Sequence, residues 1–258
     1  MLITRFYNSE GIVEMTDYMP VGEDIKNDYD YRIVRRVRGI HGKVRMKLEC
    51  YPAFDYAREK HETSISEKGA SFHTPALSLG LAGTIPLGKN GRGCYAEFEL
   101  TDEDETAVFV LHKIGKGEGC TISYSKEQAE SRFRNTIDYW RNWLSRSRYK
   151  GRWREMVNRS ALILKLLTFE PTGAIVAAPT CSLPEGIGGE RNWDYRYTWI
   201  RDAAFTVYAL LRIGFTEEAT AFMRWVVDRS AEDPSGSMQI MYGIQGEHQL
   251  EERTLDHL

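Results

Sequence analysis

Apolar and polar residues alternate along residues 1–124. Val44, Met46, Leu48 and Cys50 alternate with charged residues, and a second alternating run ends at Leu100. This period of two predicts β-strands with one buried face. Further strands are expected at Leu2–Tyr7, Ile12–Tyr18, Tyr31–Val37, Val108–His112 and Thr121–Tyr124, with turns at Ser9–Gly11, Gly39–Gly42 and Lys89–Gly91. Many short strands punctuated in this way favour a β-sandwich.

The period changes near Ser125. Apolar residues then recur every three or four positions from Ala129 to Leu144, which predicts a helix with one apolar stripe. Further helices are expected over residues 152–168, 201–213 and 216–229, with Gly214 as a left-handed cap and Thr216 as an N-cap. The run Ala161–Leu167 is apolar on nearly every side, so it should be packed on several sides. We therefore predict a β-sandwich domain over 1–124, a linker helix over 125–150 and a helical domain over 151–258.

Composition narrows the functional class. The chain has 258 residues, 42% hydrophobic and 28% charged, with a formal net charge of -3. These values are typical of a globular protein and give no global field for nucleic acid or an anionic membrane. Residues 126–159 are locally basic, which suits either a nucleic-acid patch or the solvated face of a linker helix. The absence of a recognised nucleic-acid motif favours the linker helix.

Targeting and metal signals are weak. No apolar run reaches the length of a membrane span, and the start MLITRFYNSEG does not look like a signal peptide. The 4 cysteines form no CxxC pair and the 6 histidines form no HExxH motif. We expect a cytoplasmic protein with free thiols, no metal site and no cofactor, and no nucleic-acid or membrane partner.

One segment, Arg191–Asp202, combines aromatic and charged residues. Its four aromatic residues alternate at period two and would share one face of an extended strand that enters a helix at Arg201 and Asp202. They are either core residues of a half-buried strand or a platform for a sugar. The second interpretation rests on chemistry: rings match the apolar faces of pyranoses, whereas guanidinium and carboxylate groups match their hydroxyls.

The run RNWDYRYTWIRDAAFTVYALLRIGF resembles the segment that enters the second barrel helix of glycoside hydrolase family 15, which includes glucoamylases, glucodextranases and trehalases. The pieces TRFYNSEGIVEMTDYMP, TGAIVAAPTCSLPE and MYGIQGEHQLEERTLDHL are also similar to the family. The resemblance implies an α+β chain, in which a partial antiparallel β-sandwich precedes the first helices of an (α/α)6 barrel. It also implies inverting exo-hydrolysis of α-glucosidic bonds, with the terminal glucose held by Tyr195, Trp199, Arg201 and Asp202. Trp193 and Tyr197 would be packing residues.

By the same resemblance, the catalytic glutamate pair is expected beyond Leu258, and the chain looks like an internal fragment. Glu185, Glu190 and Glu247 lie near the matched segment, but nothing in the sequence gives them a catalytic environment. The expected partner is an α-glucoside or oligosaccharide, with a second chain or self-association covering the open helices. Two alternatives stay open: a non-catalytic carbohydrate-binding remnant, and a disaccharide phosphorylase of similar architecture. The RNWDYRYTWIRD string favours the hydrolase.

Overall fold

The computed structural model describes residues 1–21, 32–101, 105–120, 122, 125–189, 192–232 and 234–256. The chain divides into two compact units, Met1–Tyr139 and Trp140–Leu258. Tyr31, most of the predicted strand Thr121–Tyr124, Glu190 and Arg191 lie outside the described residues. The domain boundaries proposed from the sequence stay predictions.

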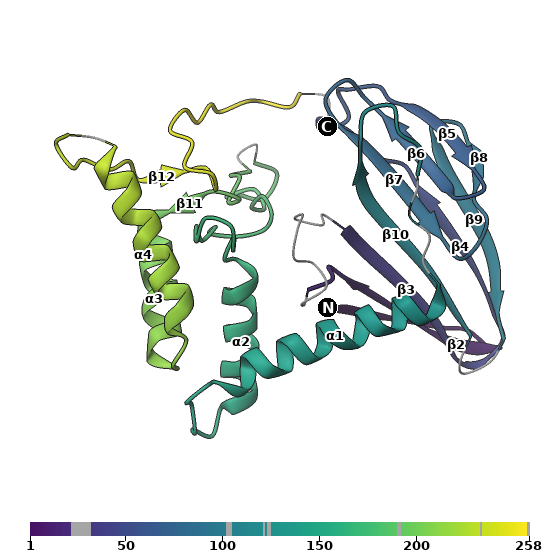
Figure 1. Cartoon of the computed structure of the whole chain (residues 1–258), viewed down its shortest axis with the longest axis horizontal. Coiled ribbons are helices and arrows are strands. Elements are labelled where there is room, and N and C mark those ends of the chain that lie inside the picture. The colour runs from purple at the N-terminus through teal and green to yellow at the C-terminus, as the bar shows by residue number, and fades with distance from the viewer. Residues whose placement is uncertain are drawn as a thin grey trace. The chain divides into compact units, whose positions relative to one another are not determined.

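The first unit contains two antiparallel sheets in the part of the chain that is described (Figure 1). The larger sheet has the strand order β1-β2-β3-β10-β7-β6-β5, and the smaller has the order β4-β9-β8. The strands are β1 Leu2–Tyr7, β2 Gly11–Tyr18, β3 Arg32–Gly42, β4 Val44–Cys50, β5 Glu62–Ser66, β6 Gly69–His73, β7 Ser78–Gly83, β8 Gly88–Asn90, β9 Gly93–Leu100 and β10 Thr106–Ile114. The predicted antiparallel β region followed by helices is thus confirmed.

The central strand β10 is buried on both faces. Ala107 and Phe109 join a core that also takes residues from β4 and β9, so this core lies between the two sheets. Val108 and Val110 belong to a second cluster, which includes Ala129 from the first helix. Successive strand side chains point to opposite faces, so one strand fills two cores.

The turn expected at Gly39–Gly42 is wrong. Strand β3 continues to Gly42, whose φ is +64°, and β4 of the smaller sheet begins two residues later at Val44. The register shifts between Ile12 and Val13, which pair with His41 and Gly39, so a β-bulge absorbs the extra residue. Gly39 and Gly42, which the sequence analysis took as turn signals, therefore lie in the bulged β2–β3 strand pair.

Helix α1 (Lys126–Ser145) runs from the first unit into the second. Its first half covers the large sheet: the ring of Phe133 meets Tyr18 edge-on at 5.6 Å, and Glu130 pairs with Arg36 at 3.0 Å. The apolar stripe predicted for this segment is therefore a packing face. The alternative of a nucleic-acid patch gains no support from it.

The second unit is helical (Figure 1). Its elements are α2 Arg154–Leu166, β11 Thr198–Trp199, α3 Ile200–Arg212, α4 Thr216–Ala231 and β12 Met241–Tyr242. One core joins Ala203 and Val207 of α3 to Phe222 and Trp225 of α4. A second joins Trp143 at the end of α1 to α2 and α3.

The turn between α3 and α4 follows the prediction in part. Gly214 has φ +99° and its N–H donates to Leu211 O at 3.1 Å, so it is the expected left-handed cap. Thr216, however, is the first helical residue, and Phe215 is the N-cap with no side-chain bond. The Thr216 N-cap is therefore wrong.

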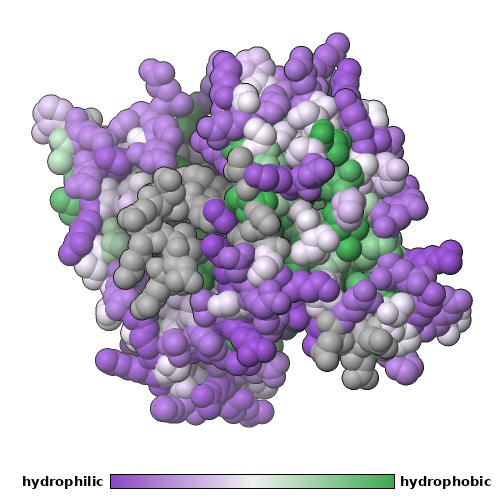
Figure 2. All heavy atoms as spheres, turned by 45° about the vertical axis from the view of Figure 1, so that its right-hand side comes forward, coloured by the Kyte–Doolittle hydropathy of each residue, from purple (hydrophilic) through white to green (hydrophobic). Residues whose placement is uncertain are grey.

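Apolar side chains also reach the surface. On the face drawn in Figure 2, hydrophobic residues (green) are visible among hydrophilic ones (purple). In α2, Ile163 is 53% and Leu166 is 63% exposed, so the expectation that Ala161–Leu167 is packed on several sides is not met here. No described helix is both long enough and apolar enough to cross a membrane.

Candidate sugar-binding segment

The segment Trp193–Ile200 runs between two partners that are distant from each other in sequence. On one side, Ser182 N donates to Trp193 O at 2.7 Å, and Ala178 N donates to Tyr195 O at 3.0 Å. On the other side, β11 pairs with β12, and Ile200 N donates to Ile240 O at 3.1 Å. The predicted strand is regular only at Thr198–Trp199, where it pairs with β12. Before that point its partner is the loop over residues 177–182, which makes only isolated backbone hydrogen bonds to it.

Arg201 and Asp202 lie in the first turn of α3, as the sequence predicts. The Arg201 guanidinium donates to Asp202 Oδ2 through Nη2 at 3.2 Å and Nε at 3.3 Å. The side chains are 76% and 41% exposed. The helix N-cap, Trp199, makes no side-chain bond, and the Asp202 carboxylate faces Arg201. Exposed ion pairs contribute about 0–1 kcal/mol to stability. The Arg201–Asp202 pair therefore adds little to the stability of the fold.

The aromatic residues of the segment are half-buried. Tyr195 and Trp199, which the resemblance assigns to the sugar, each retain some exposure. The Trp199 Nε1 atom is shielded from solvent and has no hydrogen-bond acceptor among the described residues. Trp193 Nε1 instead donates to Glu185 Oε1 at 2.7 Å. Whether Tyr195 and Trp199 contact a ligand stays a prediction.

A second Arg–Asp pair precedes the first. Arg196 donates to Asp194 through its backbone N–H at 3.0 Å, through Nε at 2.9 Å and through Nη2 at 2.7 Å. The side-chain hydrogen bond from Arg196 is the main cause that lowers the pKa of Asp194. Sequence reasoning gave this pair no role. Its spacing, i and i+2 in an extended chain, is the signal that could have found it.

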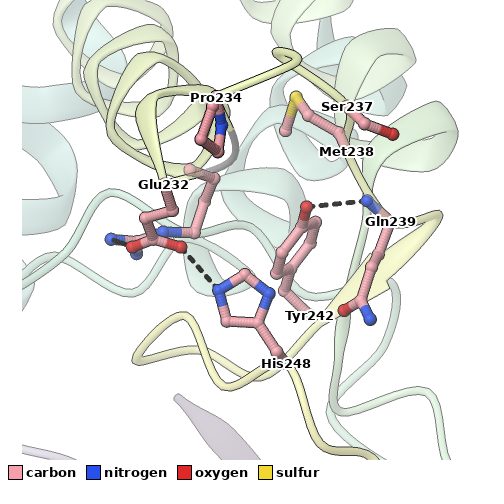
Figure 3. Close-up of a pocket in the computed structure, with 8 residues that line it drawn as sticks. Glu232, Pro234, Ser237, Met238, Gln239, Tyr242 and His248 are labelled. Carbon is pink, nitrogen blue, oxygen red and sulfur yellow. Dashed lines mark hydrogen bonds and ion pairs between the residues drawn. The ribbon is translucent and has the colours of Figure 1, made fainter.

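A pocket of about 500 Å³ lies beside β12 (Figure 3). Its polar wall comes from a chain of ion pairs, in which Glu232 contacts both Arg229 and His248. Tyr242 Oη accepts from Gln239 N at 2.7 Å. Because Tyr242 pairs with Thr198 in the β11–β12 ladder, the pocket and the aromatic segment share one small scaffold. The sequence analysis gave these residues no role, and it noted Tyr242 and His248 only within the family-like piece MYGIQGEHQLEERTLDHL.

The loop glutamates do not form a catalytic arrangement. Glu185 and Glu247 are exposed, and Glu247 Oε2 accepts from Gln245 N at 3.0 Å within a turn. Glu190 lies outside the described residues. A general acid that works near neutral pH requires a raised pKa, for which burial is the usual cause. Glu185 and Glu247 lack that burial, so neither has the surroundings that a general acid needs.

Comparison with known proteins places this segment in a family. Residues 151–258 match the sequence profile of glycosyl hydrolases family 15. A trehalase of Thermoplasma volcanium is 36% identical over 258 residues, which are 100% of this chain and 40% of that protein. A trehalase of Thermoplasma acidophilum is 38% identical over 99% of this chain and 43% of its own length. A third, from Mycolicibacterium smegmatis, is 37% identical over 90% of this chain and 36% of its own.

The chain thus spans less than half the length of each of these relatives. The matches extend over both units, so they cover the β-sheets as well as the helices and the aromatic segment. The profile match alone includes Tyr195, Trp199, Arg201 and Asp202. The chain belongs to glycosyl hydrolases family 15.

Proposed function

We propose that this chain supplies the glucose-binding segment of a glycoside hydrolase that cleaves trehalose. The observation that carries the proposal is the match of the whole chain to proteins named trehalase. It is supported by an exposed Arg–Asp pair at the start of α3, directly after the aromatic run. The substrate is a carbohydrate with α-glucosidic linkage.

The chemistry of the segment suits one glucose ring. Asp202 accepts hydrogen bonds from two adjacent hydroxyls, and Arg201 donates to a neighbouring hydroxyl in a fixed fork. Tyr195 and Trp199 offer flat apolar surface and polar edges. The Trp199 Nε1–H, which has no acceptor among the described residues, would gain one in a sugar oxygen. Each charged hydrogen bond of this kind contributes about 1.5–3 kcal/mol.

Cleavage requires two carboxyl groups, and the described residues near the aromatic segment include no buried carboxyl pair of this kind. In an inverting hydrolase one carboxylic acid protonates the leaving oxygen and one carboxylate activates water, about 6.5–9.5 Å apart. We place this glutamate pair in the remaining length that the trehalase relatives have, on later helices of an (α/α)6 barrel that α2, α3 and α4 begin. Arg201 and Asp202 then bind and orient the sugar.

The anomeric form of the product tests the proposal. The complete protein, extended to the length of the relatives, is mixed with α,α-trehalose and followed by proton NMR before mutarotation. Inversion gives one β-glucose from the attacked ring and one α-glucose from the leaving ring. Equal initial amounts are expected, without added phosphate. Two α-glucoses would contradict inversion, glucose 1-phosphate formed only with phosphate would indicate a phosphorylase, and binding without turnover would indicate a non-catalytic remnant.

A further inference from the structure

Two of the four cysteines face each other across a strand pair. Cys50, the last residue of β4, is the direct partner of Cys94 in β9. Both side chains point to the same side of the small sheet, because both belong to the core between the two sheets. Both are free thiols in this structure. Sequence reasoning noted that no CxxC pair exists and expected free thiols, and the strand register is what brings these two residues together.

The strand geometry suits a covalent bond. Paired residues of antiparallel strands have Cα atoms about 4.5–5.5 Å apart, and disulfides span Cα distances of about 4.4–6.8 Å. The register therefore places the two residues within the Cα range that a disulfide spans. We propose that Cys50 and Cys94 form a reversible cross-strand disulfide, which makes this strand pair a thiol modification site.

The two thiols differ in acidity and in exposure, and these differences decide which of them reacts first with an oxidant. The hydrogen bond from Cys94 to Cys50, followed by the positive charge of Arg35, lowers the pKa of the Cys50 thiol despite its burial. The same hydrogen bond, together with burial, raises the pKa of Cys94. Cys50 is half-buried, whereas Cys94 is fully buried. Because the accessible thiolate is the reactive species, Cys50 reacts first.

The oxidant is a small-molecule disulfide. The Cys50 thiolate attacks one sulfur of the reagent, which forms a mixed disulfide and releases one reagent thiolate. The Cys94 sulfur loses its proton and attacks the Cys50 sulfur, so the mixed disulfide breaks and a second reagent thiolate leaves. The chain loses two protons and two electrons, and the reagent is reduced to two thiols. Excess dithiol reverses both steps.

The two remaining cysteines serve as internal controls. Cys120 is buried, and its sulfur lies 3.5 Å from His112 Nε2. Cys181 is exposed in the second unit. Neither has a cysteine as strand partner. We expect Cys181 to carry the reagent as a mixed disulfide and Cys120 to stay reduced.

Peptide mapping tests the proposal on the 258-residue chain. The folded chain is treated with glutathione disulfide, blocked with an alkylating reagent and digested with trypsin, which places each cysteine in a different peptide. The expected product links peptide 48–58 to peptide 93–113, and dithiothreitol abolishes the link. The Cys120→Ser, Cys181→Ser double variant should lose 2 Da on oxidation, because only the proposed pair remains.

Stability gives an independent readout. Oxidation should raise the unfolding midpoint by about 10 °C, because a disulfide constrains the unfolded chain. Cys50→Ser and Cys94→Ser should each abolish both the peptide link and this shift. The proposal fails if peptides 48–58 and 93–113 stay unlinked in the oxidised wild type. It also fails if Cys50 retains the glutathione adduct as the end product, or if links form only between chains.

Discussion

At the scale of single residues, Arg201 and Asp202 are the side chains whose replacement separates binding from folding. In the complete enzyme, Asp202→Asn keeps the shape but removes the charge. A lost charged hydrogen bond of about 1.5–3 kcal/mol corresponds to a fall of about 10–150-fold in kcat/KM. Arg201→Lys should cost about as much, because an ammonium group lacks the planar fork. Initial rates on trehalose measure both.

The control for this prediction is a packing residue of the same segment. Trp193→Phe removes the hydrogen bond to Glu185 and should change kcat/KM far less. The competing role for Asp202 is stabilisation of the α3 N-terminus, which predicts a lower Tm with unchanged kinetics. Unchanged kcat/KM in a destabilised Asp202→Asn enzyme would therefore defeat the binding role. The observed pairing of its carboxylate with Arg201 argues against a capping bond.

Sequence reasoning located the Arg201–Asp202 pair because both residues are neighbours at a helix start. It did not find the Asp194–Arg196 pair or the Glu232–His248 contact. The second of these joins the C-cap residue of α4 to the segment after β12, and only tertiary packing brings them together. Local patterns predict which residues lie next to each other in one element, whereas contacts between elements depend on the fold.

At the scale of elements, alternation predicted several strands that have one solvent-exposed face, although it missed β5 (Glu62–Ser66), which also alternates. Strand β4 alternates buried and exposed residues and was found, as was β9. Strand β6 (Gly69–His73) has four consecutive buried residues, and β7 is nearly as buried, so neither alternates. Their small residues, such as Gly69 and Ala70, also give a weak apolar signal. Strands buried on both faces cannot be recognised by a period of two.

A buried ion pair joins three helices of the second unit. Glu218 of α4 is 3% exposed, and its Oε1 accepts from Lys165 Nζ of α2 at 2.8 Å and from Trp143 Nε1 of α1 at 2.7 Å. Glu218→Ala leaves the Lys165 ammonium, on a side chain that is only 16% exposed, without its counter-charge; breaking a buried pair typically costs about 3–5 kcal/mol. Denaturant unfolding measures this loss.

Its neighbour Glu217 provides a matched control. Glu217 is 72% exposed on its side chain and pairs with Arg146 at 2.8 Å. Glu217→Ala should change the free energy of unfolding by about 0–1 kcal/mol. Equal effects of the two substitutions would show that the buried pair does not hold the helices together.

The same pair predicts a pH dependence. Burial acts to raise the pKa of Glu218, but the hydrogen bonds from Lys165 and Trp143 outweigh it and lower the pKa. A lowered carboxyl pKa stabilises the fold above the unfolded-state value of about 4.3, and this stabilisation disappears as pH falls through the folded-state pKa. The difference in unfolding free energy between wild type and Glu218→Gln should therefore shrink below about pH 4. A difference that is constant down to acid unfolding would contradict the assignment.

At the scale of the whole molecule, helix α3 has two apolar faces. One face, with Ala203, Val207 and Leu210, is buried in the described core. The other carries Phe205 and Tyr208, which are 72% and 63% exposed. A helix that is apolar on two sides normally packs on both. The chain spans about 40% of the length of the Thermoplasma volcanium trehalase, and we propose that a segment corresponding to the rest of that length covers this second face.

Without that occupant, the 258-residue chain should associate with itself. At about 25 cal/mol per Å², an apolar patch of several hundred Å² supplies enough free energy to drive contact between copies. Sedimentation velocity should show a concentration-dependent shift to larger species. Phe205→Glu with Tyr208→Glu should return the chain toward monomer, because each buried carboxylate would oppose association. Arg224→Glu, an exposed polar position of α4, changes the net charge by the same -2 and should leave association unchanged. A chain that is monomeric at every concentration and melts cooperatively would show that the exposed face needs no partner.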